Sequence, residues 1–260
     1  MPLFKTSNPA LGSKTFEEAA RGVGRYGGGG ALDVTDRMTL NGTVNRTGIL
    51  LLCALATASY TWYSFMQTRD PGSIGGLLTL GVFGGFIAAM VTIFKTNWAP
   101  ITAPIYALFE GLFLGGISAF LELRYPGLAI QAVGLTFGVL MTMLVVYASG
   151  MIRVTNKLRI GIIAATGGIC LFYLMEMILG LFHINFMAVN GSGTIGIGFS
   201  LLVCAVAALN LVLDFDFIEQ GVNYGAPKYM EWYGAFGIMV TLVWLYVEIL
   251  NLLSKMRSRN

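Results

Sequence analysis

Seven long apolar runs constrain this chain of 260 residues more than any other feature. A helix rises 1.5 Å per residue, so about 20 apolar residues cross the ~30 Å hydrocarbon layer of a membrane. Lipid cannot satisfy free backbone N–H and C=O groups, so runs of this length must be helical there. The sequence therefore predicts an all-α integral membrane protein with seven transmembrane helices. The predicted spans are Thr47–Met66, Gly72–Phe94, Ile101–Leu121, Leu128–Ala148, Ile160–Phe182, Thr194–Phe217 and Trp232–Leu253.

The composition supports a membrane protein and excludes several other classes. Hydrophobic residues make up 56% of the chain and charged residues 11%, whereas soluble domains carry about 25% charged residues. The net charge of +3 comes without a lysine or arginine stripe, so nucleic-acid binding is not expected. Cys53, Cys170 and Cys204 lie in apolar runs, away from any C-x-x-C pair. We therefore expect neither a zinc site nor a resident cofactor.

The two ends of the chain differ from its middle. Residues 1–46 are polar and mixed in charge, which predicts a flexible N-terminal tail before a transmembrane domain at 47–260. Basic residues favour the cytoplasmic side of a membrane. If the chain crosses the membrane seven times, eleven lysine and arginine residues lie on the same side as the N-terminus and five lie on the opposite side. We therefore expect a cytoplasmic N-terminus and a location in the plasma (inner) membrane. The first set is Lys5, Lys14, Arg21, Arg25, Arg37, Arg46, Lys95, Arg153, Lys157, Arg159 and Lys228, and the second is Arg69, Arg124, Lys255, Arg257 and Arg259.

Acidic residues enter the predicted spans, but no lysine or arginine lies in the core of one. A charged carboxylate at the membrane centre costs roughly 2.5–3.5 kcal/mol, and burial favours its protonated form. Carboxylate oxygens are also the ligands that a hard cation such as calcium prefers. The pattern indicates proton or cation sites and a path for cations. The acids within spans are Glu110, Glu176, Asp214, Asp216 and Glu248, while Glu219 and Glu231 lie close to span ends.

Two of these acids are the favoured functional candidates. Asp214 shares a helix face with Asn210, and Glu248 shares one with Asn251 and Thr241. Each acid therefore belongs to a polar stripe, which suits a proton or cation site inside a helix bundle.

Each of the other acids could serve either as a proton or cation site or in helix packing. Glu110 is either a proton or cation site or a hydrogen-bond partner of a neighbouring helix. Asp216 points nearly opposite to Asp214, so its alternative role is that of an acid exposed at the membrane interface. Glu176 lies nearer a span end, where we expect a role in packing or at the interface. Glycine pairs four residues apart, such as Gly111 and Gly115, indicate close helix packing, within the chain rather than between copies.

The last two runs, NLVLDFDFIEQGVNYGAPKYMEWYGAFGIMVTLVWLYVEILNLL, resemble the Bax inhibitor family, also called the transmembrane Bax-inhibitor-motif family, and its bacterial branch in particular. ALFEGLFLGGIS, around Glu110, is similar to the family's third helix. The resemblance covers roughly residues 45 to 255. The positions that match the family's signatures are Asp214 and Ile218 in the sixth helix, and Leu245, Tyr246, Glu248 and Asn251 in the seventh.

The resemblance implies seven helices, with two groups of three around the last one. It also implies a pH-sensitive calcium leak in which acids on helices six and seven share a proton and gate the pore. Carried over, the pair is Asp214 with Glu248, whose oxygens would also bind calcium transiently as the permeant ion. The chain departs from the family in two ways. Glu248 replaces an aspartate, and Lys95 is the one available residue for a basic latch on the second helix.

Position along the helices makes the pairing difficult. Asp214 lies 20 residues after Thr194, about 30 Å into its helix, and Glu248 lies 16 residues after Trp232, about 24 Å into its own. Straight antiparallel helices would keep these acids apart unless the connection folds inward or the last helix starts later. Glu231 is therefore a rival partner for Asp214.

The sequence fits three functional classes other than a calcium leak to different degrees. A membrane interaction protein could modulate a membrane protease or a cell-death or stress partner through its tail. A proton-coupled transporter is possible, although no pair of broken helices stands out. An enzyme is not expected, because the Gly-x-Gly-Asp motif of intramembrane aspartyl proteases is absent and the chain has one histidine. The oligomeric state stays open.

Overall fold

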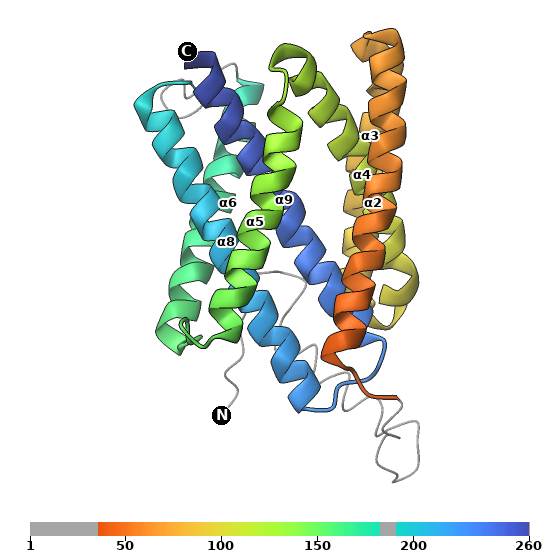
Figure 1. Cartoon of the computed structure of the whole chain (residues 1–260), viewed down its shortest axis with the longest axis vertical. Coiled ribbons are helices and arrows are strands. Elements are labelled where there is room, and N and C mark those ends of the chain that lie inside the picture. The colour runs from red at the N-terminus through yellow and green to blue at the C-terminus, as the bar shows by residue number, and fades with distance from the viewer. Residues whose placement is uncertain (1–35, 183–190, 260) are drawn as a thin grey trace. The chain divides into compact units, whose positions relative to one another are not determined.

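A computed structural model describes residues 36–182 and 191–259. This part of the chain contains seven helices that are long and apolar enough to cross a membrane, which confirms the predicted fold class. Figure 1 shows their order along the chain. The long helices are α2 Leu40–Thr68, α3 Pro71–Phe94, α4 Ala99–Arg124, α5 Leu128–Ala148, α6 Asn156–Leu181, α8 Thr194–Asn223 and α9 Met230–Arg259, and the short 3₁₀ helix η2 Thr96–Trp98 precedes α4.

Several helices extend beyond the apolar runs that predicted them. α2 begins at Leu40 rather than Thr47, so the end of the predicted tail is helical, while residues 1–35 lie outside the described residues. α8 continues to Asn223 and stops before Gly225, whose φ of 67° suits glycine. α9 continues through a basic stretch to Arg259. Hydropathy detects the apolar part of a helix. It does not detect the polar turns at the helix ends, so the predicted bounds are too short.

Carboxylates fix two of the tight turns between helices. Asp70 caps α3 by accepting a hydrogen bond from the backbone N–H of Gly72 at 2.9 Å. Glu122, near the end of α4, accepts the backbone N–H of Gly127 at 2.6 Å and that of Ala129 at 3.0 Å. These acids satisfy N–H groups that would otherwise lack partners at the helix starts.

The chain divides into two compact units. The first contains the described residues up to 120 together with 214–240, and therefore holds α2, α3, most of α4, the end of α8 and the start of α9. The second contains 121–213 and the residues from 241 onward, and therefore holds α5, α6, the start of α8 and the rest of α9.

Glycines bring α4 close to α2 in the first unit. A Cβ atom at Gly111 would overlap the backbone of Ala54, and one at Gly115 would overlap that of Ala58. The Thr57 hydroxyl donates a hydrogen bond to the backbone oxygen of Leu108 at 2.8 Å, across the two helices. These two glycines thus serve packing within the chain, as predicted.

The second unit has a core between α6, α8 and α9. Ile169, Val203 and Val206 are its buried centre. Tyr173 and Trp244 pack against them and bring a hydroxyl and an indole to the edge of that core. The polar groups of Tyr173 and Trp244 are therefore positioned by packing against buried apolar side chains.

Candidate functional site

Glu248 is the central polar group of the second unit. It lies on α9 with 4% of its surface exposed. The Tyr173 hydroxyl donates a hydrogen bond to its Oε1 atom at 2.7 Å. Its other oxygen, Oε2, is buried and has no hydrogen-bond partner among the described residues. A carboxylate oxygen in this position needs a proton or a cation.

The ring of Tyr173 is fixed by its aromatic neighbours on α6 and α8. It meets Phe199 edge to face, with ring centroids 6.3 Å apart and an interplanar angle of 89°. Phe199 also contacts Phe172 at a centroid distance of 5.0 Å. This packing holds the hydroxyl of Tyr173 in position for Glu248.

Lys255 is a buried cation that sequence reasoning placed outside the membrane core. It lies two turns after Glu248 on α9, and 7% of its surface is exposed. Its Nζ atom donates to the Ser200 hydroxyl at 2.9 Å and reaches the backbone oxygen of Gly196 at 3.5 Å. The sequence places Lys255 beyond the last predicted span, so its burial inside the second unit was not foreseen. The spacing of seven residues, which keeps Lys255 on the face of Glu248, was the signal available in the sequence.

α8 carries the polar stripe of Asn210 and Asp214. The Asn210 side-chain amide donates to the Thr166 hydroxyl at 2.8 Å and to the backbone oxygen of Val206 at 2.9 Å. Asp214, one turn later, has no exposed surface. Asp216 is half-buried and accepts a hydrogen bond from the Gln220 amide at 2.6 Å.

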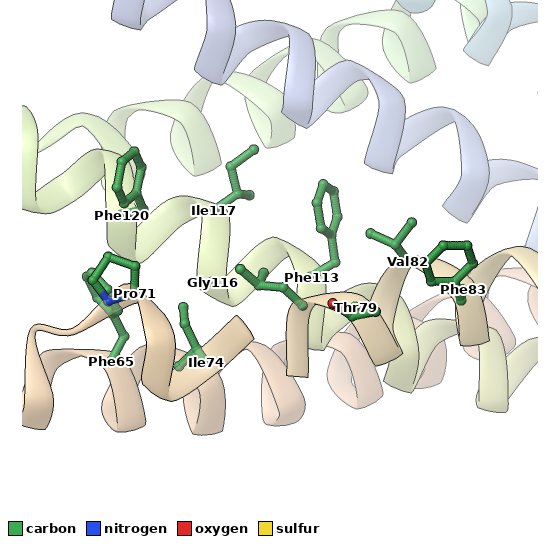
Figure 2. Close-up of a pocket in the computed structure, with 11 residues that line it drawn as sticks. Phe65, Pro71, Ile74, Thr79, Val82, Phe83, Phe113, Gly116, Ile117 and Phe120 are labelled. Atoms are coloured by element: carbon green, nitrogen blue, oxygen red, sulfur yellow. The ribbon is translucent and has the colours of Figure 1, made fainter. Parts of the chain in front are cut away.

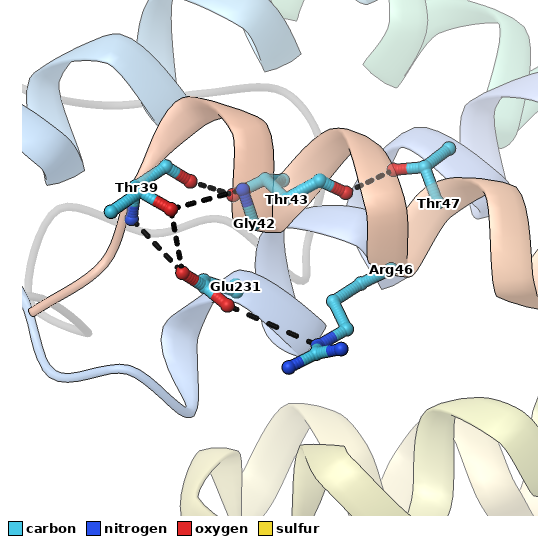
Figure 3. Close-up of polar contacts among 6 residues, drawn as sticks. All are labelled: Thr39, Gly42, Thr43, Arg46, Thr47 and Glu231. Atoms are coloured by element: carbon cyan, nitrogen blue, oxygen red, sulfur yellow. Dashed lines mark hydrogen bonds and ion pairs between the residues drawn. The ribbon is translucent and has the colours of Figure 1, made fainter. Parts of the chain in front are cut away.

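Glu231 joins the start of α9 to the start of α2 (Figure 3). It is 2% exposed. Its Oε1 atom accepts hydrogen bonds from the backbone N–H of Thr39 at 3.1 Å and from the Thr39 hydroxyl at 2.9 Å. Its Oε2 atom lies 3.9 Å from Nε of Arg46, and the Arg46 guanidinium stacks over the Trp232 ring at 4.9 Å. Both oxygens of Glu231 thus have partners.

The segment before α2 is also tied to the connection between α8 and α9. The backbone N–H of Met38 donates to the oxygen of Ala226 at 2.7 Å, and that of Lys228 donates to the oxygen of Asp36 at 2.9 Å. A Cβ atom at Gly42 would collide with the Glu231 carboxylate, so any larger residue there would displace that side chain. Residues 36–39 therefore belong to the fold of the first unit.

Glu110 lies half-buried on α4, and Tyr106 is its hydrogen-bond partner one turn earlier. A Cβ atom at Gly85 of α3 would lie 3.1 Å from its Oε1 atom, so this glycine leaves room for the carboxylate. Lys95, the candidate for a basic latch, has its ammonium over the Trp98 ring at 4.4 Å.

The two favoured acids lie at different depths along their own helices. Asp214 is nine residues before the end of α8, about 14 Å, and Glu248 is 18 residues after the start of α9, about 27 Å. α9 starts at Met230, two residues earlier than predicted. Asp214 belongs to the first unit and Glu248 to the second.

An apolar cleft of about 410 Å³ lies along α3 and α4 in the first unit (Figure 2). Ile74, Val82, Phe113 and Phe120 are among its lining residues, and Thr79 is the polar side chain in the wall. A cleft lined in this way carries no charge that could attract a cation. The described residues hold no group of three or more histidine, cysteine, aspartate or glutamate side chains that could bind a metal ion.

Comparison with known proteins identifies a family but no individual relative. None of the curated proteins compared and none of the solved structures compared matches the chain. The sequence profile of the family described as Bax inhibitor 1 like matches residues 5–258, which is nearly the whole chain. The protein therefore belongs to the Bax inhibitor 1 like family of membrane proteins.

Proposed function

We propose that the protein is a pH-sensitive cation leak that passes calcium and is gated by the proton occupancy of Asp214 and Glu248. The observation that carries the proposal is the Glu248 carboxylate. One of its oxygens is held by Tyr173, and the other is buried without a hydrogen-bond partner among the described residues. An oxygen of this kind is stable when it carries a proton or faces a cation.

A buried carboxyl group of this type is a natural switch. Protonated, Glu248 is neutral and its burial costs little. Ionised, it needs a positive partner, and a hard cation meets that need through the same oxygens. The Tyr173 hydroxyl fixes one oxygen, so the other is the atom at which proton and cation compete.

Asp214 is the second proton site of the proposal. It has no exposed surface, and the family resemblance assigns the proton-sharing role to the acids of the sixth and seventh helices. Two interacting carboxyl groups titrate as one coupled pair, so the proton count on the pair sets its state. A shared proton ties the last two helices, and its loss shifts a closed-to-open equilibrium.

Calcium is the proposed permeant ion because the acids would offer it oxygen ligands and a negative potential. Each site must bind the ion weakly enough to release it, as conduction requires. The proposal therefore needs a transient contact with Asp214 and Glu248 and no resident metal.

The experiment is calcium flux into liposomes that contain the purified protein, measured over a series of pH values. Wild-type protein, Asp214→Asn, Glu248→Gln and the double variant are compared. We expect each single variant to flatten the pH dependence. The double variant should resemble the single variants, because the sites of a coupled pair are not additive.

Glu219→Gln is the matched control, since Glu219 is an exposed acid on the same helix as Asp214. It should keep the wild-type pH profile. An unchanged profile in both single variants would reject the proposal. Effects that simply add in the double variant would show that the two acids act separately, and a loss of pH response in Glu231→Gln alone would move the proton site to Glu231.

A further inference from the structure

We propose that Lys255 is a tethered cation that fills a cation site in the second unit and keeps the leak slow. Its ammonium contacts the oxygen atoms of Ser200 and Gly196, in the same unit as Glu248. Without Lys255, a permeating cation would bind these oxygen atoms. The role as a brake on flux rests on the proposed function, whereas the occupied cation site is tested independently of it.

The surroundings of the ammonium are those of a cation site. Nζ lies 2.9 Å from the Ser200 hydroxyl oxygen and 3.5 Å from the Gly196 backbone oxygen. Ser200 is 1% exposed and Lys255 is 7% exposed, so both lie away from bulk solvent. Hydroxyl and backbone oxygens are ligands that hard cations accept. Lysine is strongly hydrated, and it is rarely buried without such partners.

The negative charge of the site comes from α6 and α9. Side chains on a helix lean toward its N-terminus, which favours an approach of the Lys255 side chain toward the turn that precedes it on α9. Glu248 lies two turns before Lys255 on the same face of α9, and Glu176 is a half-buried acid of α6 in the same unit. Glu248 also has the buried oxygen without a hydrogen-bond partner among the described residues. A second cation is therefore attracted to these acids and repelled by the ammonium already there.

The helix dipole of α8 does not attract the ammonium of Lys255. Gly196 lies in the first turn of α8, where the helix dipole is positive and disfavours a cation. The attraction must come from the oxygens and from the acids. If the ammonium is removed, these groups remain and become available to a mobile cation.

The test measures calcium flux in liposomes with three lysine variants. Lys255→Met removes the charge and keeps most of the side-chain length, Lys255→Arg keeps the charge, and Lys157→Met removes an exposed lysine of α6. We expect flux to rise about tenfold in Lys255→Met, because a unit charge beside the path strongly affects a cation. The flux of Lys255→Arg should stay within about twofold of wild type because the positive charge is kept. The flux of Lys157→Met should also stay within about twofold, because solvent ions already screen the charge of an exposed lysine.

A second readout is calcium binding to detergent-solubilised protein by titration calorimetry. Lys255→Met should bind calcium more tightly than wild type, and the added Glu248→Gln substitution should abolish that gain. Ser200→Ala, which removes one partner of the ammonium and leaves the charge, keeps the test valid if Lys255→Met does not fold. It should raise flux less than Lys255→Met does.

The two proposals fail in different ways. If Asp214→Asn and Glu248→Gln change the pH response but the Lys255 and Ser200 variants change neither flux nor calcium binding, the cation role of Lys255 is overturned. If no variant conducts but Lys255→Met gains calcium binding that depends on Glu248, the occupied cation site stands and the leak is rejected.

Discussion

Individual buried acids in this protein differ in how completely their oxygen atoms are partnered. Glu231 accepts two hydrogen bonds on one oxygen and faces Arg46 with the other. Glu248 accepts a hydrogen bond from Tyr173 on one oxygen, and its other oxygen has no hydrogen-bond partner among the described residues. A fully partnered carboxylate is suited to hold two helices together, whereas an incompletely partnered one is suited to bind and release a proton.

At the residue scale, Glu231→Ala is expected to destabilise the fold without altering the pH response of flux. The substitution leaves the backbone N–H of Thr39 without its acceptor and the Arg46 guanidinium without its ion-pair partner. Leaving a buried donor unsatisfied costs about 1–3 kcal/mol, so the thermal unfolding temperature in detergent should fall clearly. Glu219→Ala, at an exposed site, should change the unfolding free energy by less than about 0.5 kcal/mol. A stable Glu231→Ala protein with an altered pH profile would contradict the structural role.

The sequence predicted which acids would be buried better than it predicted their partners. Carboxylates in apolar runs stand out because each is costly in lipid, and Asp214 and Glu248 are indeed buried. Arg46 and Lys255 lie near the ends of runs, where basic residues usually extend to the interface, so they were counted as flanking charges. Their contacts with Glu231 and Ser200 depend on residues far away in the chain.

At the scale of the helices, glycine decides how closely neighbours approach. Gly115 of α4 lies against the backbone of Ala58 on α2, whereas Gly134 of α5 has nothing within 4 Å of the position of a Cβ atom. The same residue type therefore has opposite consequences in two spans. Glycines four residues apart predicted close packing of α4 against another helix, but the spacing did not identify α2 as that helix.

Gly115→Ala is expected to separate α2 from α4 and to lower the unfolding free energy by about 1–3 kcal/mol, as overpacking does. Thermal unfolding in detergent measures the change. Gly134→Ala is the matched control, because its added methyl group meets open space and should leave the unfolding temperature close to that of wild type. Equal effects of the two substitutions would show that helix propensity, rather than packing, dominates at Gly115.

Helix number and type were predictable, while helix ends were not. The seven apolar runs correspond one to one with the seven long helices of the described residues. The start of α2 depends on Thr39, whose side chain accepts the backbone N–H of Gly42, and on Glu231 from the far end of the chain. Such a cap is set by tertiary contacts, so apolar content placed the start too late.

At the scale of the whole molecule, the seven membrane-length helices of the described residues and the distribution of basic residues favour one orientation. The structure buries Arg159 and Lys255, with 8% and 7% of their surfaces exposed. If both are removed from the flanking charges, ten basic residues remain on the N-terminal side and four on the other. The arrangement of two three-helix groups around the last helix stays a prediction.

We therefore predict that the N-terminus is cytoplasmic and the C-terminus lies across the membrane, because flanking lysine and arginine residues are retained on the cytoplasmic side. Alkaline phosphatase is active after export, and green fluorescent protein fluoresces in the cytoplasm, so reporter fusions expressed in a bacterial host distinguish the sides. Fusion after residue 260 should give phosphatase activity and no fluorescence. Fusion at residue 97, in the connection between α3 and α4, should give the reverse. Fluorescence from both fusions would mean that α9 does not cross the membrane, and would remove the path on which Glu248 and Lys255 are proposed to act.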